Sequence, residues 1–201
     1  MRKILIVEVS PNGGNSGSRT AAKHLVERLK DANPDLTTIS RDLAAHPIPH
    51  ATGALVGTYF TPPEGRTAEQ KELIRLSDGL VDELLAASII VISTPMWNFS
   101  MPSVLKAWID YVIRAGRTFN YTNQGPQGLV SGKKVYLVMS SGGVYSSGPA
   151  ASYDQLSPAL KTQLGFIGLT DIEIIRVEGT NMPDVAKDAI PKAIAMIDKI
   201  S

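Results

Sequence analysis

The sequence has no cysteine among its 201 residues, and this absence removes several classes of site at once. Such a chain forms no disulfide, offers no thiolate nucleophile, and holds neither an iron–sulfur cluster nor a cysteine-ligated zinc ion. The three histidines, His24, His46 and His50, form no metal-ligand pattern with carboxylates. We therefore expect no metal site, and a cytoplasmic location fits the composition.

Long hydrophobic runs are absent as well, since no segment approaches the roughly 18 apolar residues that span a bilayer. The apolar opening from Ile4 to Val7 imitates a signal peptide, but Glu8 interrupts it and no cleavage site follows. Neither sign of charge dominates: 20 Lys and Arg face 19 Asp and Glu, so nothing points to nucleic acid or an anionic membrane. The sequence predicts one soluble domain over residues 1–201.

Two common nucleotide-binding motifs are also missing. The loop after the first apolar run contains Gly13, Gly14 and Gly17, which do not give the G-x-G-x-x-G spacing of a dinucleotide site. A P-loop needs Gly-Lys followed by Ser or Thr, and the lysine after Gly132 is followed by Lys134. Any nucleotide must therefore be bound in another way.

Apolar runs alternate with helical patterns along the chain. The strand-like runs are Ile4–Val9, Leu36–Ser40, Ser88–Ser93, Val135–Ser140 and Ile172–Val177. The helical patterns are Arg19–Lys30, Thr67–Leu85, Pro102–Ala115, Asp154–Leu164 and Pro183–Ile200. This alternation predicts an α/β fold with a parallel sheet and right-handed crossovers. Of two long connections, Asp42–Arg66 is expected to cover a site or a partner rather than form a core element, and Ala115–Lys134 to form a hairpin-like excursion.

The stretch from Ile89 to Phe99 is the most informative part of the sequence. Its first four residues are apolar and β-branched, which is typical of a parallel strand covered by helices on both faces. The Thr94-Pro95 pair is expected to stop this strand, because proline lacks a ladder donor. The expected boundaries are Ser93 for the strand end, Ser100 or Met101 for the next helix cap, Pro102 for its first turn and Gly116 for its stop.

Met96, Trp97, Asn98 and Phe99 fall between this strand and the helix. They bring backbone N–H groups, one amide and two aromatic rings to the carboxyl end of a strand, where open α/β sheets bind ligands. Such a loop suits a flat heterocycle with polar edges. The alternative is an ordinary loop whose aromatic rings cover the core.

Two further loops carry features of ligand binding. Ser16 and Ser18 precede a periodic helix, where hydroxyls and free N–H groups can hold a phosphate; the alternative is a capping serine in a flexible loop. The fourth strand ends at Ser140, and Gly142 and Gly143 then permit close approach to a ligand. Because all three loops meet at one sheet edge, they describe bound flavin mononucleotide (FMN), with its ring and phosphate at opposite ends.

These residues resemble the FMN-dependent NADH-azoreductase and quinone-reductase family over essentially the whole chain. The motifs that carry the resemblance are Pro95–Asp110, Arg117–Leu129 with Gly132–Lys134, and Leu164–Asp171. The resemblance implies a flavodoxin-like fold: a doubly wound, five-stranded parallel sheet in the order 2-1-3-4-5 with helices on both faces.

The resemblance also implies one FMN per subunit and the residues that bind it. The implied set is Ser10, Ser16, Gly17 and Ser18 for the phosphate, Pro95, Met96, Trp97, Asn98 and Phe99 for ribityl and ring, and Ser140, Ser141, Gly142 and Gly143 for the pyrimidine end. Many relatives have Tyr in place of Trp97, and some have Arg in place of Ser141. No catalytic side chain is assigned, because flavin N5 carries the chemistry.

The implied activity is a ping-pong reduction of quinones or azo bonds, with NADH, or alternatively NADPH, as electron donor. The family further implies a homodimer with active sites at its interface. Phe60, Phe119, Tyr121 and Tyr145 are the expected substrate or partner contacts, with local packing as the alternative. Two other functions compete: an electron carrier, which the net charge of +1 disfavours, and a non-catalytic interaction module, which the intact loops disfavour.

Overall fold

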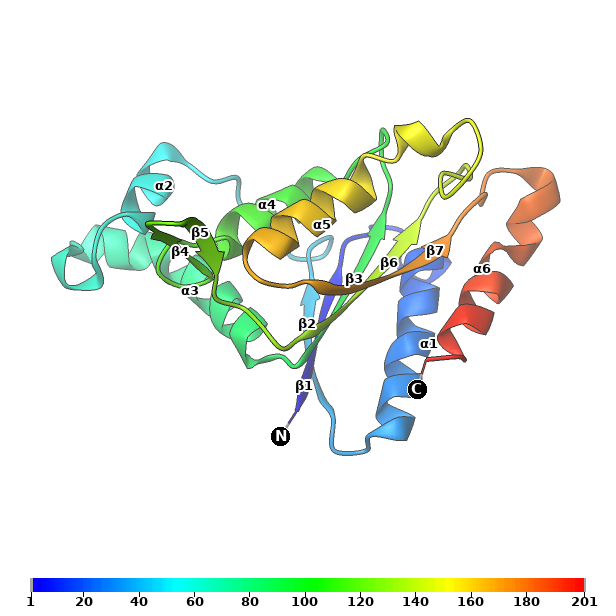
Figure 1. The fold of residues 1–201 in the computed structure, drawn as a ribbon, viewed down its shortest axis with the longest axis horizontal. Coiled ribbons are helices and arrows are strands. Elements are labelled where there is room, and N and C mark those ends of the chain that lie inside the picture. Colours follow the sequence, from blue (N-terminus) through cyan, green and yellow to red (C-terminus); the bar gives the residue numbers. More distant parts are fainter. Residues whose placement is uncertain (1, 201) are drawn as a thin grey trace.

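The computed structural model describes residues 2–200, which form a five-stranded parallel sheet with helices on both faces (Figure 1). The strands are β1 (Lys3–Glu8), β2 (Thr37–Asp42), β3 (Ile89–Pro95), β6 (Lys134–Ser140) and β7 (Asp171–Val177). Their order is β2-β1-β3-β6-β7, with every neighbouring pair parallel, so the expected order 2-1-3-4-5 is confirmed. The chain changes direction across the sheet between β1 and β3, which is where such folds bind ligands.

Six α-helices accompany the sheet: α1 (Gly17–Ala32), α2 (Gly53–Tyr59), α3 (Ala68–Ala86), α4 (Ser103–Val112), α5 (Leu156–Phe166) and α6 (Pro183–Ile197). Helices α1 and α6 cover one face, where Val91 and Val138 are buried. Helices α3, α4 and α5 cover the other, where Ile92 and Leu137 are buried. Successive residues of a strand point to opposite faces of the sheet, so a strand covered on both faces, such as β3, carries apolar residues on both. No helix within residues 2–200 has the length and apolar character to cross a membrane.

The boundaries around α4 differ from those expected. Strand β3 continues to Pro95, because a missing N–H is tolerated at its last position, and Met96 N–H donates to Ser140 O at 2.7 Å. Pro102 itself is the N-cap of α4, so the expectation of Ser100 or Met101 is wrong.

Helix α4 also ends at Val112, four residues before Gly116. The cause is the Thr118 hydroxyl, which donates to Val112 O at 2.8 Å and accepts from Arg114 N–H at 2.8 Å. These two bonds satisfy groups that would otherwise continue the helix. Gly116, with φ of +76°, lies in the turn that follows. A residue six positions beyond Val112 therefore ends the helix, which local sequence signals do not reveal.

The two long connections have opposite outcomes. Asp42–Arg66 contains α2, which Thr52 caps by accepting from Leu55 N–H at 3.2 Å. Leu55 is 1% exposed and belongs to the core, so the expectation that this connection forms no core element is wrong. The hairpin in Ala115–Lys134 is confirmed as antiparallel β4 (Phe119–Thr122) and β5 (Gly125–Gly128). Helix α2 and this hairpin lie together at the end of the molecule opposite α6 (Figure 1).

Candidate active site at the carboxyl edge of the sheet

A cavity of about 480 Å³ opens where the loops after β1, β3, β6 and β7 meet. The residues expected to bind a cofactor that line it are Ser10, Ser16, Gly17, Pro95, Met96, Trp97, Ser140, Ser141 and Gly142. Asn98, Phe99 and Gly143 belong to the same loops and Ser18 to the first turn of α1, but these four residues do not line the cavity. The tertiary structure thus brings the three loops together, as the parallel sheet predicted.

The first loop presents a helix N-terminus to the cavity. Ser16 is the N-cap of α1, and its Oγ accepts from Arg19 N–H at 3.4 Å and lies 3.2 Å from Ser18 Oγ. Ser10, Ser16 and Ser18 are all buried. The first-turn N–H groups of a helix have no intrahelical acceptor, so they remain available to an anion beside these hydroxyls.

Gly17 and Gly142 are glycines for reasons of space. A Cβ on Gly17 would lie 3.0 Å from Val177 Cγ1, which packs the start of α1 tightly against the end of β7. A Cβ on Gly142 would lie 2.6 Å from Asn181 Nδ2. A side chain at Gly17 would press on Val177 of β7, and one at Gly142 would require the Asn181 side chain to shift.

The turn after β3 is held by two hydrogen bonds between Trp97 and Ser100, each 2.9 Å long. Its two central residues have positive φ, +48° at Asn98 and +67° at Phe99. Asparagine adopts this conformation readily, whereas for a bulky residue such as Phe it costs about 1 kcal/mol. Strained backbone of this kind concentrates at functional sites.

The aromatic residues of this turn do not serve as core. Trp97 is 47% exposed and Phe99 46% exposed, so the alternative that they merely cover the core is wrong. The Phe99 ring packs edge-on against Tyr145, with 6.0 Å between centroids, and in a tilted arrangement against Tyr153, with 5.2 Å between centroids. These three rings form an aromatic cluster beside the turn after β3.

The loop after β6 is braced by the loop after β7. Gly179, Thr180 and Asn181 donate their N–H groups to the carbonyls of Gly143, Ser141 and Gly142, at 3.0 to 3.1 Å. Thr180 and Asn181 also line the cavity, as do Asn12 and Asn15 of the first loop. Sequence reasoning missed these four residues. The signal for the first two was available, because Gly179, Thr180 and Asn181 form a polar, glycine-containing loop after the fifth strand of the sheet.

Two arginine–aspartate ion pairs lie next to these loops. Arg19 contacts Asp42 through both Nη atoms, at 2.9 and 2.8 Å, and this hydrogen bonding lowers the pKa of Asp42. Arg176 Nη2 donates to Asp154 at 2.7 Å. Burial raises the pKa of Asp154, but hydrogen bonds from Ser157 and Arg176 outweigh it, and the net shift is downward. Both carboxylates are therefore held in the charged form.

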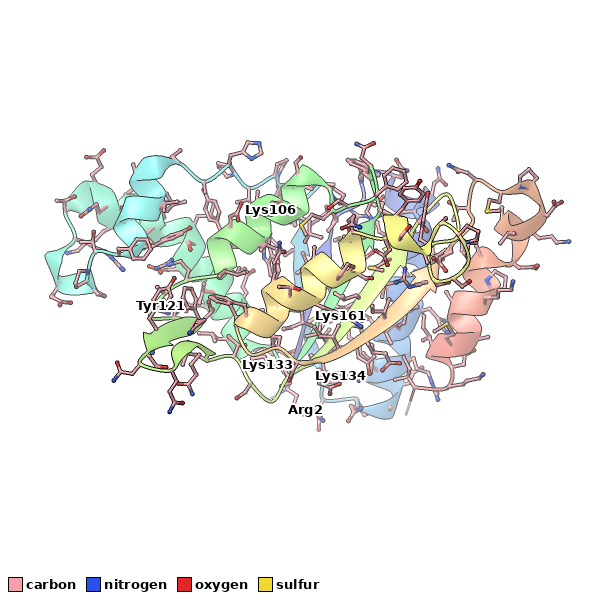
Figure 2. All side chains as sticks on the ribbon, turned by 45° about the horizontal axis from the view of Figure 1, so that its top comes forward. Arg2, Lys106, Tyr121, Lys133, Lys134 and Lys161 are labelled. Atoms are coloured by element: carbon pink, nitrogen blue, oxygen red, sulfur yellow. The ribbon has the colours of Figure 1, made fainter. Side chains whose placement is uncertain are left out.

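The four residues expected to contact substrate or partner are placed differently from one another. Tyr145 packs beside Gly143 and Phe99 without lining the cavity, and its N–H donates to Glu178 Oε1 at 2.8 Å. Phe119 is 7% exposed and packs on Phe166 at 4.6 Å, which is the local-packing alternative. Phe60 and Tyr121 are 68% and 70% exposed, away from the cavity of their own chain. Figure 2 shows Tyr121 on the hairpin that projects at one end of the molecule.

The donor set of this site fits FMN. Buried hydroxyls and a helix N-terminus suit a phosphate. Half-exposed aromatic rings, together with the backbone of Gly142, suit a flat ring with polar edges. Metal ligands are not gathered anywhere in residues 2–200, where no three His, Asp or Glu side chains form a metal-binding group.

Comparison with known proteins agrees with this geometry. Residues 2–200 match a family model described as a flavodoxin-like fold. The chain belongs to this flavodoxin-like family. One relative is an FMN-dependent NADH:quinone oxidoreductase of Rhizobium johnstonii, 50% identical over 202 residues that cover 100% of this chain and 98% of the relative. Another, FMN-dependent NADH:quinone oxidoreductase 2 of Hahella chejuensis, is 46% identical over 198 residues that cover 98% of both chains.

Solved structures of the flavodoxin-like family superpose closely on this chain. An azoreductase from Bacillus anthracis has a TM-score of 0.91 and 32% identity, covering 99% of this chain and 98% of that one. An FMN-dependent NADH-azoreductase from the same organism, solved in complex with FMN, has a TM-score of 0.86 and 25% identity, covering 99% of both chains. The whole described chain, rather than the site alone, therefore shares this fold.

Proposed function

We propose that this protein is an FMN-dependent NADH:quinone oxidoreductase with azoreductase activity. The observation that carries the proposal is the single cavity in which a serine-capped helix N-terminus meets the half-exposed Trp97 turn. A relative with 50% identity over 98% of its length is named an FMN-dependent NADH:quinone oxidoreductase, and a structure with a TM-score of 0.91 is an azoreductase. These similarities support the enzyme over an electron carrier or a non-catalytic module.

At the phosphate end, Ser10, Ser16 and the first-turn N–H groups of α1 would replace the hydration of a phosphate dianion without a lysine. Met96 and Trp97 would line the ribityl chain and ring, next to Ser140 and Ser141. FMN held there would supply the redox chemistry, which is the transfer of two electrons from NADH to a quinone or an azo bond.

The protein's own contribution at the ring end is orientation and electrostatic stabilisation. Within residues 2–200, the N–H groups of Asn98, Gly142 and Gly143 donate to no protein acceptor, so they are available to a polar ring edge. Preorganised N–H donors of this kind stabilise developing negative charge. We assign no side chain as a general acid or base; Tyr145 lies beside Gly143 and does not line the cavity.

We further infer a cytoplasmic homodimer with its active sites at the interface. The exposed Phe60 and Tyr121 rings support this arrangement, because neither reaches the cavity of its own chain. Large exposed aromatic side chains are enriched at protein interfaces. Light scattering after gel filtration tests the assembly: a dimeric mass is expected for the wild type, and a smaller mass for Phe60→Ser combined with Tyr121→Ser. A monomeric wild type would exclude the shared site.

The decisive experiment is a spectral titration of the purified protein with FMN, followed by NADH without oxygen and then by a benzoquinone. We expect FMN binding, bleaching of the flavin absorbance on NADH, and recovery on quinone. Failure to bind FMN would leave a non-catalytic module. Binding without turnover of NADH in the steady state would indicate an electron carrier.

A further inference from the structure

Arg19 follows the serines of the phosphate loop directly, and its place in the sequence suggests a basic ligand for a phosphate. The structure gives its guanidinium other partners. Nε donates to the backbone carbonyl of Ser10 at 2.8 Å, and the two Nη atoms bind both oxygens of Asp42 at 2.9 and 2.8 Å. Nη1 also lies 3.1 Å from Glu8 Oε1. Arg19 does not line the cavity.

The cluster formed by Arg19, Glu8 and Asp42 has a net charge of the wrong sign to attract a phosphate. One arginine faces two carboxylates, and the side chains are 14% exposed for Arg19, 26% for Glu8 and 27% for Asp42. The group therefore has a net charge of −1, and a dianion bound nearby is repelled rather than attracted by the sum. Any benefit of Arg19 to phosphate binding must come from geometry.

The geometry of Arg19 joins three segments at the edge of the sheet. Its backbone N–H donates to the N-cap Ser16, and its side chain holds the Ser10 carbonyl of the same loop. Asp42 fixes the other side of the guanidinium at the end of β2, where its Oδ1 also accepts from the N–H groups of Ala44 and Ala45 at 3.0 and 3.1 Å. A planar fork bound at both ends has little freedom to turn.

We infer that Arg19 is a positioning residue, which with Asp42 holds the Ser10–Ser16 loop in the shape that binds the phosphate of FMN without touching that phosphate. This inference rests on the proposed FMN site. It differs from direct electrostatic recognition in a measurable way, since the two accounts predict opposite signs for the loss of one carboxylate.

Asp42→Asn is the variant that separates the two accounts. If the cluster acts through its electrostatic field, removing a negative charge near the bound dianion should tighten FMN binding. If it acts through the bidentate contact between Arg19 and Asp42, the substitution should weaken FMN binding, because a neutral amide accepts one strong hydrogen bond instead of two. We expect FMN affinity to fall about threefold to tenfold. Riboflavin, which lacks the phosphate, should bind within about twofold of its wild-type affinity.

Arg19→Gln and Arg19→Lys complete the series. Lysine keeps the charge but cannot bind two Asp42 oxygens and the Ser10 carbonyl together. On the positioning account, FMN affinity falls about tenfold or more in both variants. Arg19→Lys retains the means of testing the inference should Arg19→Gln fail to fold. The matched control is Arg41→Gln, which breaks the neighbouring pair with Glu83 and leaves the phosphate loop untouched.

Affinities are measured on apoprotein by quenching of flavin fluorescence, with the thermal midpoint of each apoprotein recorded beside them. Selective loss of FMN over riboflavin in the Asp42 and Arg19 variants, with Arg41→Gln unchanged, supports the inference. Unchanged or tighter FMN binding in Asp42→Asn, or wild-type FMN binding in Arg19→Lys, overturns it. Wild-type protein that binds neither flavin would instead overturn the proposed function.

Discussion

The proposed FMN site has a phosphate end at the loop after β1 and a ring end at the loops after β3 and β6, and each end is connected to an arginine–aspartate pair in a different way. At the phosphate end, Arg19 donates directly to the Ser10 carbonyl at 2.8 Å while it holds Asp42. At the ring end, Arg176 holds Asp154 at 2.7 Å and lies 3.6 Å from Glu178, which in turn accepts from Tyr145 N–H. The first connection is direct, and the second passes through an additional carboxylate.

The same two ends also differ in the burial of their side chains and in backbone strain. Serines at the phosphate end are buried and bonded to one another, and their loop caps a helix in an ordinary conformation. The ring end exposes Trp97 and Phe99 on a turn with positive φ at Asn98 and Phe99. A charged group needs fixed polar partners, whereas a flat ring needs accessible apolar surface. The phosphate end should therefore discriminate FMN from riboflavin, and the ring end should not.

The largest effect is expected from Ser16→Ala combined with Ser18→Ala. Loss of the Ser16 hydroxyl, which lines the cavity, and of the Ser18 hydroxyl, which is bonded to it, should lower FMN affinity about a hundredfold and leave riboflavin within about twofold, as measured by fluorescence quenching. Thr52→Ala is the control, because it removes the cap of α2 at a distance from the cavity. An equal loss of affinity for both flavins would contradict the difference between the two ends, since it would mean that the serines shape the whole site.

Trp97→Ala should lower the affinity for both flavins about tenfold, because the indole offers its face to the ring and not to the phosphate. The same titrations with FMN and riboflavin measure it. Trp97→Tyr, which keeps an aromatic face, should bind both almost as the wild type does. A change in the FMN-to-riboflavin ratio would contradict the division between the two ends.

Asp154→Asn tests the second arginine pair through pH. The folded-state pKa of Asp154 is lowered, so its contribution to stability is fully present above its unfolded pKa of about 4 and is lost as the pH falls below that value. The variant should be about 1 kcal/mol less stable at pH 7. This difference should shrink at about pH 3 in thermal or urea unfolding. A constant difference across this range would show that the charge of Asp154 contributes nothing.

The smallest effect is expected from Asn98→Gly in the strained turn, for which Asn98→Val is the contrasting variant. Asn98→Gly should change the free energy of unfolding by no more than about 0.5 kcal/mol, because both residues accept a φ of +48°. Asn98→Val should cost about 1–2 kcal/mol, since a β-branched residue clashes in this conformation. Equal stability of the two variants in urea titrations would mean that the turn relaxes and stores no strain.

Much of the fold and of the candidate site could be predicted from the amino-acid sequence. The β-branched run Ile89–Ile92 is buried on both faces as strand β3, and the three loops expected at one edge do meet there. Helix α2 could not be predicted, because two of its seven residues, Gly53 and Gly57, have low helix propensity. In addition, Leu55 is buried only through contact with the rest of the core. The early end of α4 escapes prediction for a similar reason, since Thr118 acts from outside the helix.

The strands, most helices and the loops of the candidate site follow from local patterns in the chain, because apolar periodicity and helix-end signals encode them. The partners that hold those loops follow from the three-dimensional packing. Asp42 lies 23 residues from Arg19, and Arg176 lies 22 residues from Asp154. The alignment of β1 with β2 sets the first pair, and the packing of α5 on the sheet beside β7 sets the second. Contacts of this kind depend on strand register and helix docking, which the whole core fixes together and no local pattern specifies.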